Sequence, residues 1–150
     1  MKGIELLNEQ IGKTLMDGCI QSFELNGELV DMINVTFLKF DDWIKIVSTD
    51  EQTNISLENM EFENIAKYGN DEFSYPISKI EKNFPEFKKY IGKRLIGINE
   101  LVLSKNSNFS FGINLYFDNE LNFIIHNQDY PIDKNEFIFE NKVPNDLIEK

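Results

Sequence analysis

The sequence predicts an α+β protein made of two similar halves, each a helix followed by an antiparallel meander of strands. Three observations predict this fold: apolar residues recur at helical spacing in two places, apolar and polar residues alternate along later stretches, and the chain nearly repeats itself at an offset of 80 residues. The expected units are a first repeat at 1–57, an acidic connector at 58–83 and a second repeat at 84–150. We expect them to pack about a pseudo-twofold axis as one compact unit.

The repeat is clearest between "IGKTL", residues 11–15, and "IGKRL", residues 91–95. At the same offset the apolar positions continue to match through Ile33 and Ile113, Val35 and Leu115, Phe37 and Phe117, Trp43 and Phe123, and Ile44 and Ile124. One short match could arise by chance, but a constant offset over many apolar positions indicates an internal duplication.

Each repeat is expected to begin with a helix, at residues 4–11 and 84–91. Both ranges place apolar side chains at spacing i, i+3 and i+7, which is one stripe of a helix. Gly12 and Gly92 follow directly, where a helix commonly ends in a left-handed cap. Pro85 suits the first turn of the second helix.

Strands follow each helix. First strands and turns are predicted in "CIQSFELNGELV", with a turn at Asn26–Gly27, and in "INELVLSKNSNF", with a turn near Asn106–Ser107. Second strands are predicted in "MINVTFLKF" and "NFSFGINLYF", and third strands in "WIKIVS" and "LNFIIHN". Short fourth strands are expected at "TNISLE" and "NEFIFE", and a helix at "LENMEFENIAKYG" in the connector.

The second strands also predict which side chains face the core. Strict alternation along 108–117 predicts one buried face, formed by Phe109, Phe111, Ile113, Leu115 and Phe117. In the first half, Ile33, Val35 and Phe37 are expected to point inward. Each sheet would then have one buried and one wet face.

Composition restricts the class of protein. The chain has 150 residues, of which 41% are hydrophobic, with thirteen Phe, so it can bury a substantial core. The first residues carry Glu5 and Glu9 where a signal peptide would be apolar, and no apolar run reaches membrane-spanning length. A single cysteine, Cys19, excludes an internal disulfide. We therefore expect a soluble, cytoplasmic protein.

The sequence offers little catalytic chemistry. His126 is the only histidine and Cys19 the only cysteine, and we interpret both as structural. Zinc-ligand clusters, EF-hand spacing and phosphate-binding glycine motifs are absent from the sequence. We predict no enzyme activity, no catalytic residues, no metal and no cofactor.

Net charge is the strongest compositional signal. The chain carries −11, with acidic windows at 50–72 and 118–140 and a basic window at 79–94. This charge disfavours nucleic acid and anionic membranes as partners and favours a basic protein, although solubility alone would also explain it. The predicted partner-binding residues are carboxylates and aromatics that lie in the acidic windows or in the hairpins just before them: Asp41, Asp42, Trp43, Asp50, Glu51, Glu58, Glu61, Glu63, Tyr116, Asp118, Glu120, Asp129, Tyr130 and Asp133.

The stretch "GINLYFDNELNFIIHNQD", residues 112–129, resembles small acidic bacterial immunity proteins encoded beside polymorphic toxins, and "INVTFLKFDDWIKIVSTD" resembles them more loosely. The resemblance covers about a third of the chain and implies a non-enzymatic inhibitor that covers the basic active site of a cognate toxin. Carboxylates would mimic substrate phosphates if the toxin is a nuclease. Two alternatives remain: a domain that binds a small molecule or peptide between its halves, and a structural homodimer.

Overall fold

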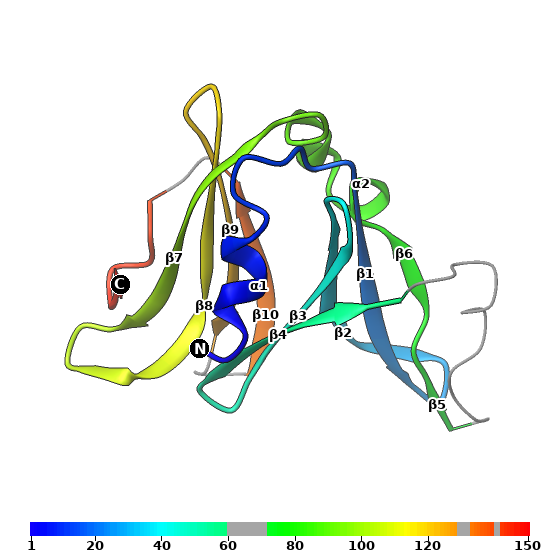
Figure 1. Cartoon of the computed structure of the whole chain (residues 1–150). Coiled ribbons are helices and arrows are strands. Elements are labelled where there is room, and N and C mark those ends of the chain that lie inside the picture. The colour runs from blue at the N-terminus through cyan, green and yellow to red at the C-terminus, as the bar shows by residue number, and fades with distance from the viewer. Residues whose placement is uncertain (60–71, 129–132, 140–141) are drawn as a thin grey trace.

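Two antiparallel sheets face each other in the computed structural model, which describes residues 1–59, 72–128, 133–139 and 142–150 (Figure 1). The first sheet has the strand order β4-β3-β2-β1-β5, and β6 also pairs with β1. Its strands are β1 (Asp17–Leu25), β2 (Glu28–Lys39), β3 (Trp43–Thr49), β4 (Gln52–Glu58), β5 (Phe73–Ser74) and β6 (Ile77–Lys79).

The second sheet has the order β10-β9-β8-β7-β11. Its strands are β7 (Leu95–Leu103), β8 (Asn106–Phe117), β9 (Leu121–Gln128), β10 (Lys134–Phe139) and β11 (Leu147–Glu149). Each sheet therefore contains a meander of four consecutive strands in the same order. The four predicted strands of each half are all present, whereas β5, β6 and β11 were not expected.

The α+β prediction is wrong, because 61% of the described residues lie in strands and 11% in helices. The only helical segments among the described residues are α1 (Ile4–Asn8), α2 (Ile80–Asn83) and the 3₁₀ helix η2 (Pro85–Lys89). Apolar spacing located two of these segments, but spacing over two turns does not set the length of a helix, and helices this short depend on packing against the sheets. The predicted helix-plus-meander halves are thus mainly sheet.

Proline explains why the second helical segment is broken. Phe84 precedes Pro85 and has φ −130° and ψ 81°, outside the helical region. The proline ring disfavours helical geometry in the residue before it. The α-helix therefore ends at Asn83, and a 3₁₀ helix begins at Pro85.

The two near-identical segments "IGKTL" and "IGKRL" pair with each other. Thr14 and Arg94 form an antiparallel bridge between the sheets. The hydrogen bonds are reciprocal: the amides of Gly12 and Leu15 donate to the carbonyls of Leu95 and Lys93, and the amides of Gly92 and Leu95 donate to the carbonyls of Leu15 and Lys13. Gly12 and Gly92 both have positive φ, 90° and 83°, as predicted, but neither caps a helix, because α1 ends at Asn8 and η2 at Lys89.

The main core lies between the two sheets. On β2 and β3 the core-facing residues include Leu38 and its cross-strand partner Ile44, and on β8 and β9 they include Leu115 and its partner Phe123. The constant offset of 80 instead aligns Phe37 with Phe117 and Trp43 with Phe123. Phe37 and Trp43 lie in a separate cluster, with Cys19 and Val35, on the outer face of the first sheet.

The offset of 80 therefore aligns equivalent residues at the Thr14–Arg94 bridge but not in the later strands. Side chains alternate between faces with a period of two, so a shift by an odd number of residues moves an aligned residue to the opposite face. Of the predicted inward residues, Ile33 belongs to the main core, whereas Val35 and Phe37 do not.

A β-bulge interrupts the predicted alternation along β8. Ile113 pairs with Glu100 and Ser110 with Val102, so the register shifts between them, and Gly112 has φ 133°. Ile113, Leu115 and Phe117 face the main core, but Phe111 and the partly buried Phe109 belong to a cluster on the outer face. The prediction that all five share one face is wrong because the bulge reverses the alternation.

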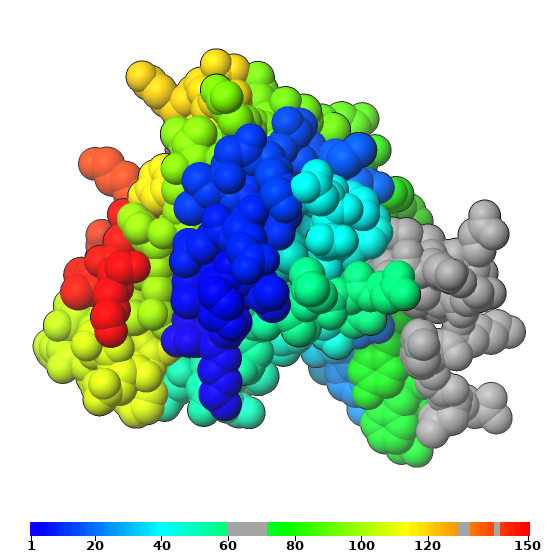
Figure 2. All heavy atoms as spheres, viewed as in Figure 1, coloured from blue at the N-terminus to red at the C-terminus, as the bar shows by residue number. Residues whose placement is uncertain are grey.

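The first residues of the chain close the seam between β4 and β7. Lys2 forms a parallel bridge with Asn54 on β4, and the amino group of Met1 lies 2.6 Å from the carboxylate of Glu100 on β7. Figure 2 shows these residues, in blue, running between the two sheets on this face of the molecule. At the opposite seam, Phe84 and Phe87 of the α2–η2 segment pack on aromatic rings of β9 and β10.

Three of the four predicted turns match the structure. Asn26 and Gly27 have φ 52° and 79°, the geometry of a two-residue hairpin turn. The turns after β2 and β8 also lie where the sequence places them, whereas the turn between β7 and β8 precedes the predicted Asn106–Ser107. Among the described residues, the helices are all too short to cross a membrane.

Candidate functional site

The hairpin turns gather at two opposite ends of the sheets. The Thr14–Arg94 bridge places the beginnings of β1 and β7 at one end, with the β2–β3 and β8–β9 turns. The β1–β2, β3–β4, β7–β8 and β9–β10 connections lie at the other end. Contacts join the two sheets there too, because the amide of Ser110 on β8 donates to the carbonyl of Glu51 in the β3–β4 turn at 2.8 Å.

Charge is distributed unequally between these ends. The second end, which we name the acidic end, carries Glu24, Glu28, Asp31, Asp50, Glu51, Glu72, Asp133 and Glu136. Among the described residues, the cations there are Lys105, Lys134, and Lys2 with the Met1 amino group, of which Met1 and Lys2 line a pocket together with Glu51. Burial raises the pKa of Asp31, the Ile33 amide opposes this shift, and the nearby charge of Asp133 adds to it. Two carboxylates from different sheets are thus brought close enough to interact.

The tip of the β1–β2 hairpin adds exposed apolar surface to the acidic end. Leu29 and Val30 are 51% and 58% exposed, and Leu25 is 36% exposed. Beside them, Phe23 stacks on Phe73 and Tyr75, with ring centroids 6.2 and 5.4 Å apart.

The hairpin is fixed by a third strand. β5 pairs with the end of β1, and the Ser74 hydroxyl donates to the Glu24 carboxylate at 2.7 Å. The amide of Asn26 in the turn donates to the carbonyl of Glu72 at 2.7 Å. The exposed side chains are therefore presented on a supported scaffold rather than on an isolated loop.

The predicted partner-binding residues do not form one surface. Asp50, Glu51 and Asp133 lie at the acidic end. The opposite end, which we name the mixed-charge end, holds Asp41, Asp42, Trp43, Glu58, Tyr116, Asp118 and Glu120. Glu61, Glu63, Asp129 and Tyr130 lie outside the described residues.

Cations accompany the carboxylates at the mixed-charge end. Lys13 Nζ lies 3.0 Å from Asp41, and Lys45 Nζ lies 3.7 Å from Glu58. Trp43, proposed as an exposed anchor, is only 8% exposed, and Lys39 Nζ lies 5.9 Å from its ring centroid. The strand length of β3 separates Asp42 from Asp50 by roughly 20 Å. One contact surface would have to span the molecule to include both groups.

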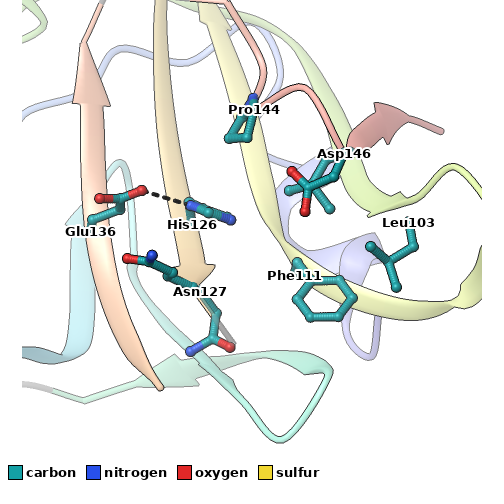
Figure 3. A pocket seen from close by; sticks show the side chains of 9 residues that line it. Leu103, Phe111, His126, Asn127, Glu136, Pro144 and Asp146 are labelled. Carbon is teal, nitrogen blue, oxygen red and sulfur yellow. Dashed lines mark hydrogen bonds and ion pairs between the residues drawn. The ribbon is translucent and has the colours of Figure 1, made fainter. Parts of the chain in front are cut away.

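A second candidate site lies on the outer face of the second sheet, where the C-terminal segment crosses it (Figure 3). This pocket has a volume of about 400 Å³. Apolar residues form one part of its lining: Leu103, Phe111, Pro144 and Leu147. Polar residues form the other part: His126, Asn127, Gln128, Glu136 and Asp146.

His126 is held in place by Glu136. Its Nδ1 lies 2.9 Å from the Glu136 carboxylate on the neighbouring strand β10, and the residue is 8% exposed. In Figure 3 the other ring nitrogen points away from Glu136, toward the part of the pocket where Phe111 and Asp146 stand. An ionised carboxylate only accepts hydrogen bonds, so in a ring with one proton that proton lies on Nδ1 and Nε2 is a hydrogen-bond acceptor.

Asn127 is also fixed by neighbours. Its Nδ2 donates to Asp133 at 2.8 Å and to the Asn135 side chain at 3.2 Å. The pocket can thus offer hydrogen-bond acceptors in fixed positions. No Ser, Thr or Cys is among its described lining residues.

No family model, curated protein or solved structure matches this chain. The resemblance to immunity proteins therefore stays a prediction that rests on the quoted residues alone. What either site does has to be argued from its own geometry. The described residues also contain no group of three or more acidic, His or Cys side chains arranged to hold a metal ion.

Sequence reasoning named Asp50, Glu51 and Asp133 of the acidic end but missed its apolar hairpin tip and the pocket at His126. His126 was interpreted as structural because its register was taken from the constant offset, which equates it with the core residue Ile46. The alternation of "FIIHNQ" next to core-facing Phe123 and Ile125 would have placed His126 on the outer face. The exposed hairpin tip could have been predicted from "FELNGELV". The predicted turn at Asn26–Gly27 lies between apolar residues, and the tip of a hairpin has no strand above it to cover them.

Proposed function

We propose that this chain is a non-enzymatic acidic binding protein, an immunity-type inhibitor that covers a basic surface of a cognate toxin with its acidic end. The observation that carries the proposal is the coincidence of unequal charge and exposed apolar side chains at that end. Glu28 lies beside Leu29 and Val30, which are about half exposed, at the tip of the β1–β2 hairpin, and Asp50 and Glu51 lie in the β3–β4 turn at the same end of the first sheet.

The two kinds of side chain would act at different steps. Carboxylates attract a basic partner and increase the rate of encounter, and this effect weakens as salt is added. Burial of the apolar tip would supply affinity, because hot spots combine buried apolar anchors with a surrounding polar rim. The ordering cost is small because β5 and the aromatic stack already support the hairpin.

The proposal extends to the kind of partner and the compartment. If the toxin is a nuclease, the carboxylates of the acidic end would occupy the positions of substrate phosphates. A cytoplasmic location agrees with the thiol of Cys19, which is free and buried. The second alternative from the sequence, a small-molecule site, is favoured by the pocket at His126 and is developed below.

The test compares two variants with the same change in net charge. E28Q/D50N/E51Q removes three charges from the acidic end, and D42N/D118N/E120Q removes three from the mixed-charge end. The wild-type chain is immobilised as bait to capture the product of the neighbouring gene. The affinity of each variant for that purified protein is then measured at several salt concentrations. We expect the acidic-end variant to bind at least about tenfold more weakly, with a shallower salt dependence, and the matched variant to bind almost normally.

Activity of the partner provides the functional readout. The wild-type chain and the matched variant should inhibit the purified toxin, whereas the acidic-end variant should not. Equal weakening by both triple variants would show that overall charge, not this surface, drives binding. Binding without inhibition would contradict the immunity role.

A further inference from the structure

We propose that the pocket at His126 binds an alkyl guanidinium group, either in a free small molecule or on an arginine side chain. The inference goes beyond the proposed inhibitor function, because it concerns a different surface and does not need a protein partner. Its basis is an acceptor-rich, negatively charged lining that faces an aromatic wall.

The acceptors come from three elements. Nε2 of His126 on β9 faces away from Glu136, and in the ring that carries one proton, on Nδ1, it is an acceptor (Figure 3). Glu136 on β10 has a side chain that is 41% exposed and binds Nδ1 of His126 through Oε1. Asp146 stands on the C-terminal segment, on the side of the pocket toward which Nε2 points.

A guanidinium group fits this arrangement better than other charged groups. It is planar and carries five N–H donors in a fixed fork, so it can serve acceptors that lie in different directions. Anions are disfavoured, because the lining contains the carboxylates of Glu136 and Asp146 and none of the described lining residues is Lys or Arg. The net charge of −11 acts in the same direction.

The apolar part of the lining accommodates the alkyl chain and the face of the cation. Phe111 is 4% exposed and offers an aromatic surface beside the polar groups, where a guanidinium plane can stack. Leu103 and Leu147 provide contact for methylene groups. The volume of about 400 Å³ lies within the range of roughly 300–1,000 Å³ of ligand pockets and suits a small ligand.

The decisive comparison uses butylguanidinium and butylurea, which have nearly the same shape but differ in charge. His126 is the only histidine, so its ring signals in nitrogen-15 NMR are unique reporters of the pocket. The only tryptophan, Trp43, reports the distant first sheet. We expect butylguanidinium to shift the His126 ring signals saturably and to leave the Trp43 indole signal unchanged, with butylurea binding at least about tenfold more weakly.

Variants separate the pocket from general charge. D146N changes an exposed residue and E136Q a partly exposed one, and each should weaken butylguanidinium about 3- to 10-fold. D42N, which removes a charge at the mixed-charge end, should leave the affinity unchanged. Backbone spectra of each variant show whether it remains folded.

Two further ligands distinguish the sources of the group. A blocked Gly-Arg-Gly peptide tests an arginine side chain, and the same peptide with citrulline is its uncharged control. Binding of the arginine peptide assigns the pocket to a protein or peptide ligand, and binding of butylguanidinium alone assigns it to a small molecule. Equal binding of butylguanidinium and butylurea, equal loss in D42N and D146N, or no saturable shift of His126 would overturn the proposal.

The outcome is separable from that of the inhibitor proposal. The triple variants of the partner experiment leave the lining of the pocket unchanged, and D146N leaves the turns of the acidic end unchanged. A chain that binds butylguanidinium but no basic protein would keep the pocket and lose the inhibitor function. A chain that binds a basic protein but not butylguanidinium would keep the inhibitor function and lose the pocket.

Discussion

Phe37 on β2 and Asn114 on β8 occupy corresponding places on the outer faces of the two sheets, yet their surroundings differ. Phe37 is 3% exposed in an apolar cluster with Cys19, Val35 and Trp43. Asn114 is 1% exposed in a polar network, where its Nδ2 donates to Tyr116 at 2.9 Å and to Glu149 at 2.8 Å. Val47 on β3 and His126 on β9 show the same contrast, because Val47 packs against the apolar cluster and His126 contacts the carboxylate of Glu136.

This difference shows which part of the structure the fold requires. The inner faces are apolar in both sheets because they form the shared core. Both outer faces also carry an apolar cluster, formed by Cys19, Val35, Phe37 and Trp43 on the first sheet and by Leu101, Phe111, Ile124 and Leu147 on the second. The second outer face differs because it adds a polar network and a pocket beside its apolar cluster, and we infer that these polar groups serve recognition.

The largest effect is expected from Gly112→Ala. Val35 occupies the corresponding place in β2, but Gly112 has φ 133°, and a Cβ there would lie 2.0 Å from the Ile125 carbonyl oxygen. Alanine should lower the free energy of unfolding by about 3 kcal/mol or more, because the strain is in the backbone and cannot be relieved by a rotamer change. Urea unfolding measures the change.

Gly97→Ala is the matched control. A Cβ at Gly97 on β7 would meet only the Tyr116 side chain at 3.8 Å, an ordinary contact. Its free energy of unfolding should stay within about 0.5 kcal/mol of wild type. If both substitutions cost the same, the bulge does not require glycine.

Replacing Phe37 and Asn114 by alanine compares the outer faces directly. Phe37→Ala should destabilise by about 3–4 kcal/mol, because it leaves a cavity in an apolar cluster. Asn114→Ala should cost about 1–2 kcal/mol, since it removes hydrogen bonds and leaves buried partners to be solvated. Both values come from urea denaturation. The reverse order would show that the polar network, not the apolar cluster, is the main stabilising feature outside the core.

The comparison also explains how far the sequence could be read. Alternation, turn residues and the repeat located all eight meander strands, because these signals are local. The buried face was predicted correctly for Ile33, Ile113, Leu115 and Phe117 but wrongly for Val35, Phe37, Phe109 and Phe111. A bulge such as the one at Gly112 cannot be seen in a perfectly alternating stretch such as "NFSFGINLYF". Helix length was overestimated because apolar spacing does not show where packing against the sheets ends a helical segment, at Asn8 in α1 and at Lys89 in η2.

The candidate sites were less predictable than the fold for a related reason. Counting charge along the chain found acidic windows but could not show that Asp41 and Asp50 lie at opposite ends of β3. The pocket depends on the C-terminal segment crossing β8 and β9, a long-range arrangement without a local signal. Among the predicted binding residues that the structure describes, only Asp50, Glu51 and Asp133 lie at the acidic end.

A smaller effect is expected from Cys19, which is 1% exposed in the apolar cluster. Burial raises the pKa of its thiol from 9.0 to about 12, with the charge of Lys79 opposing the shift. Between these values the folded chain holds a proton that the unfolded chain has lost, so stability falls as pH rises through this window. The free energy of unfolding should drop by about 1 kcal/mol between pH 8 and pH 10 on this account.

Cys19→Ala removes that titration. Its free energy of unfolding should fall less steeply than that of wild type over the same pH range, whatever its absolute stability. Other groups titrate equally in both proteins, so the difference between the two slopes isolates Cys19. Equal slopes would mean that water reaches this outer face.

The smallest effect is expected from Tyr116, a second side chain with a raised pKa, which lies on the outer face of the second sheet. Burial, together with the hydrogen bond and the charge of Glu149, raises its pKa from 10.0 to about 12, and Asn99 opposes the shift. Absorbance titration of the folded protein should therefore show one tyrosine that ionises later than an ordinary phenol. Tyr116→Phe should remove that late step and lower stability by only about 0.5–1 kcal/mol, because phenylalanine keeps the packing.

Glu149→Gln tests the cause of the shift. It removes the negative charge beside the phenol but preserves a hydrogen-bond acceptor, so the pKa of Tyr116 should fall toward 10 while burial keeps part of the shift. Glu120→Gln, at the exposed β8–β9 turn, is the control and should leave the late step in place. If Glu149→Gln leaves it in place as well, burial alone sets the titration, and the second outer face would then resemble the first more than its polar side chains suggest.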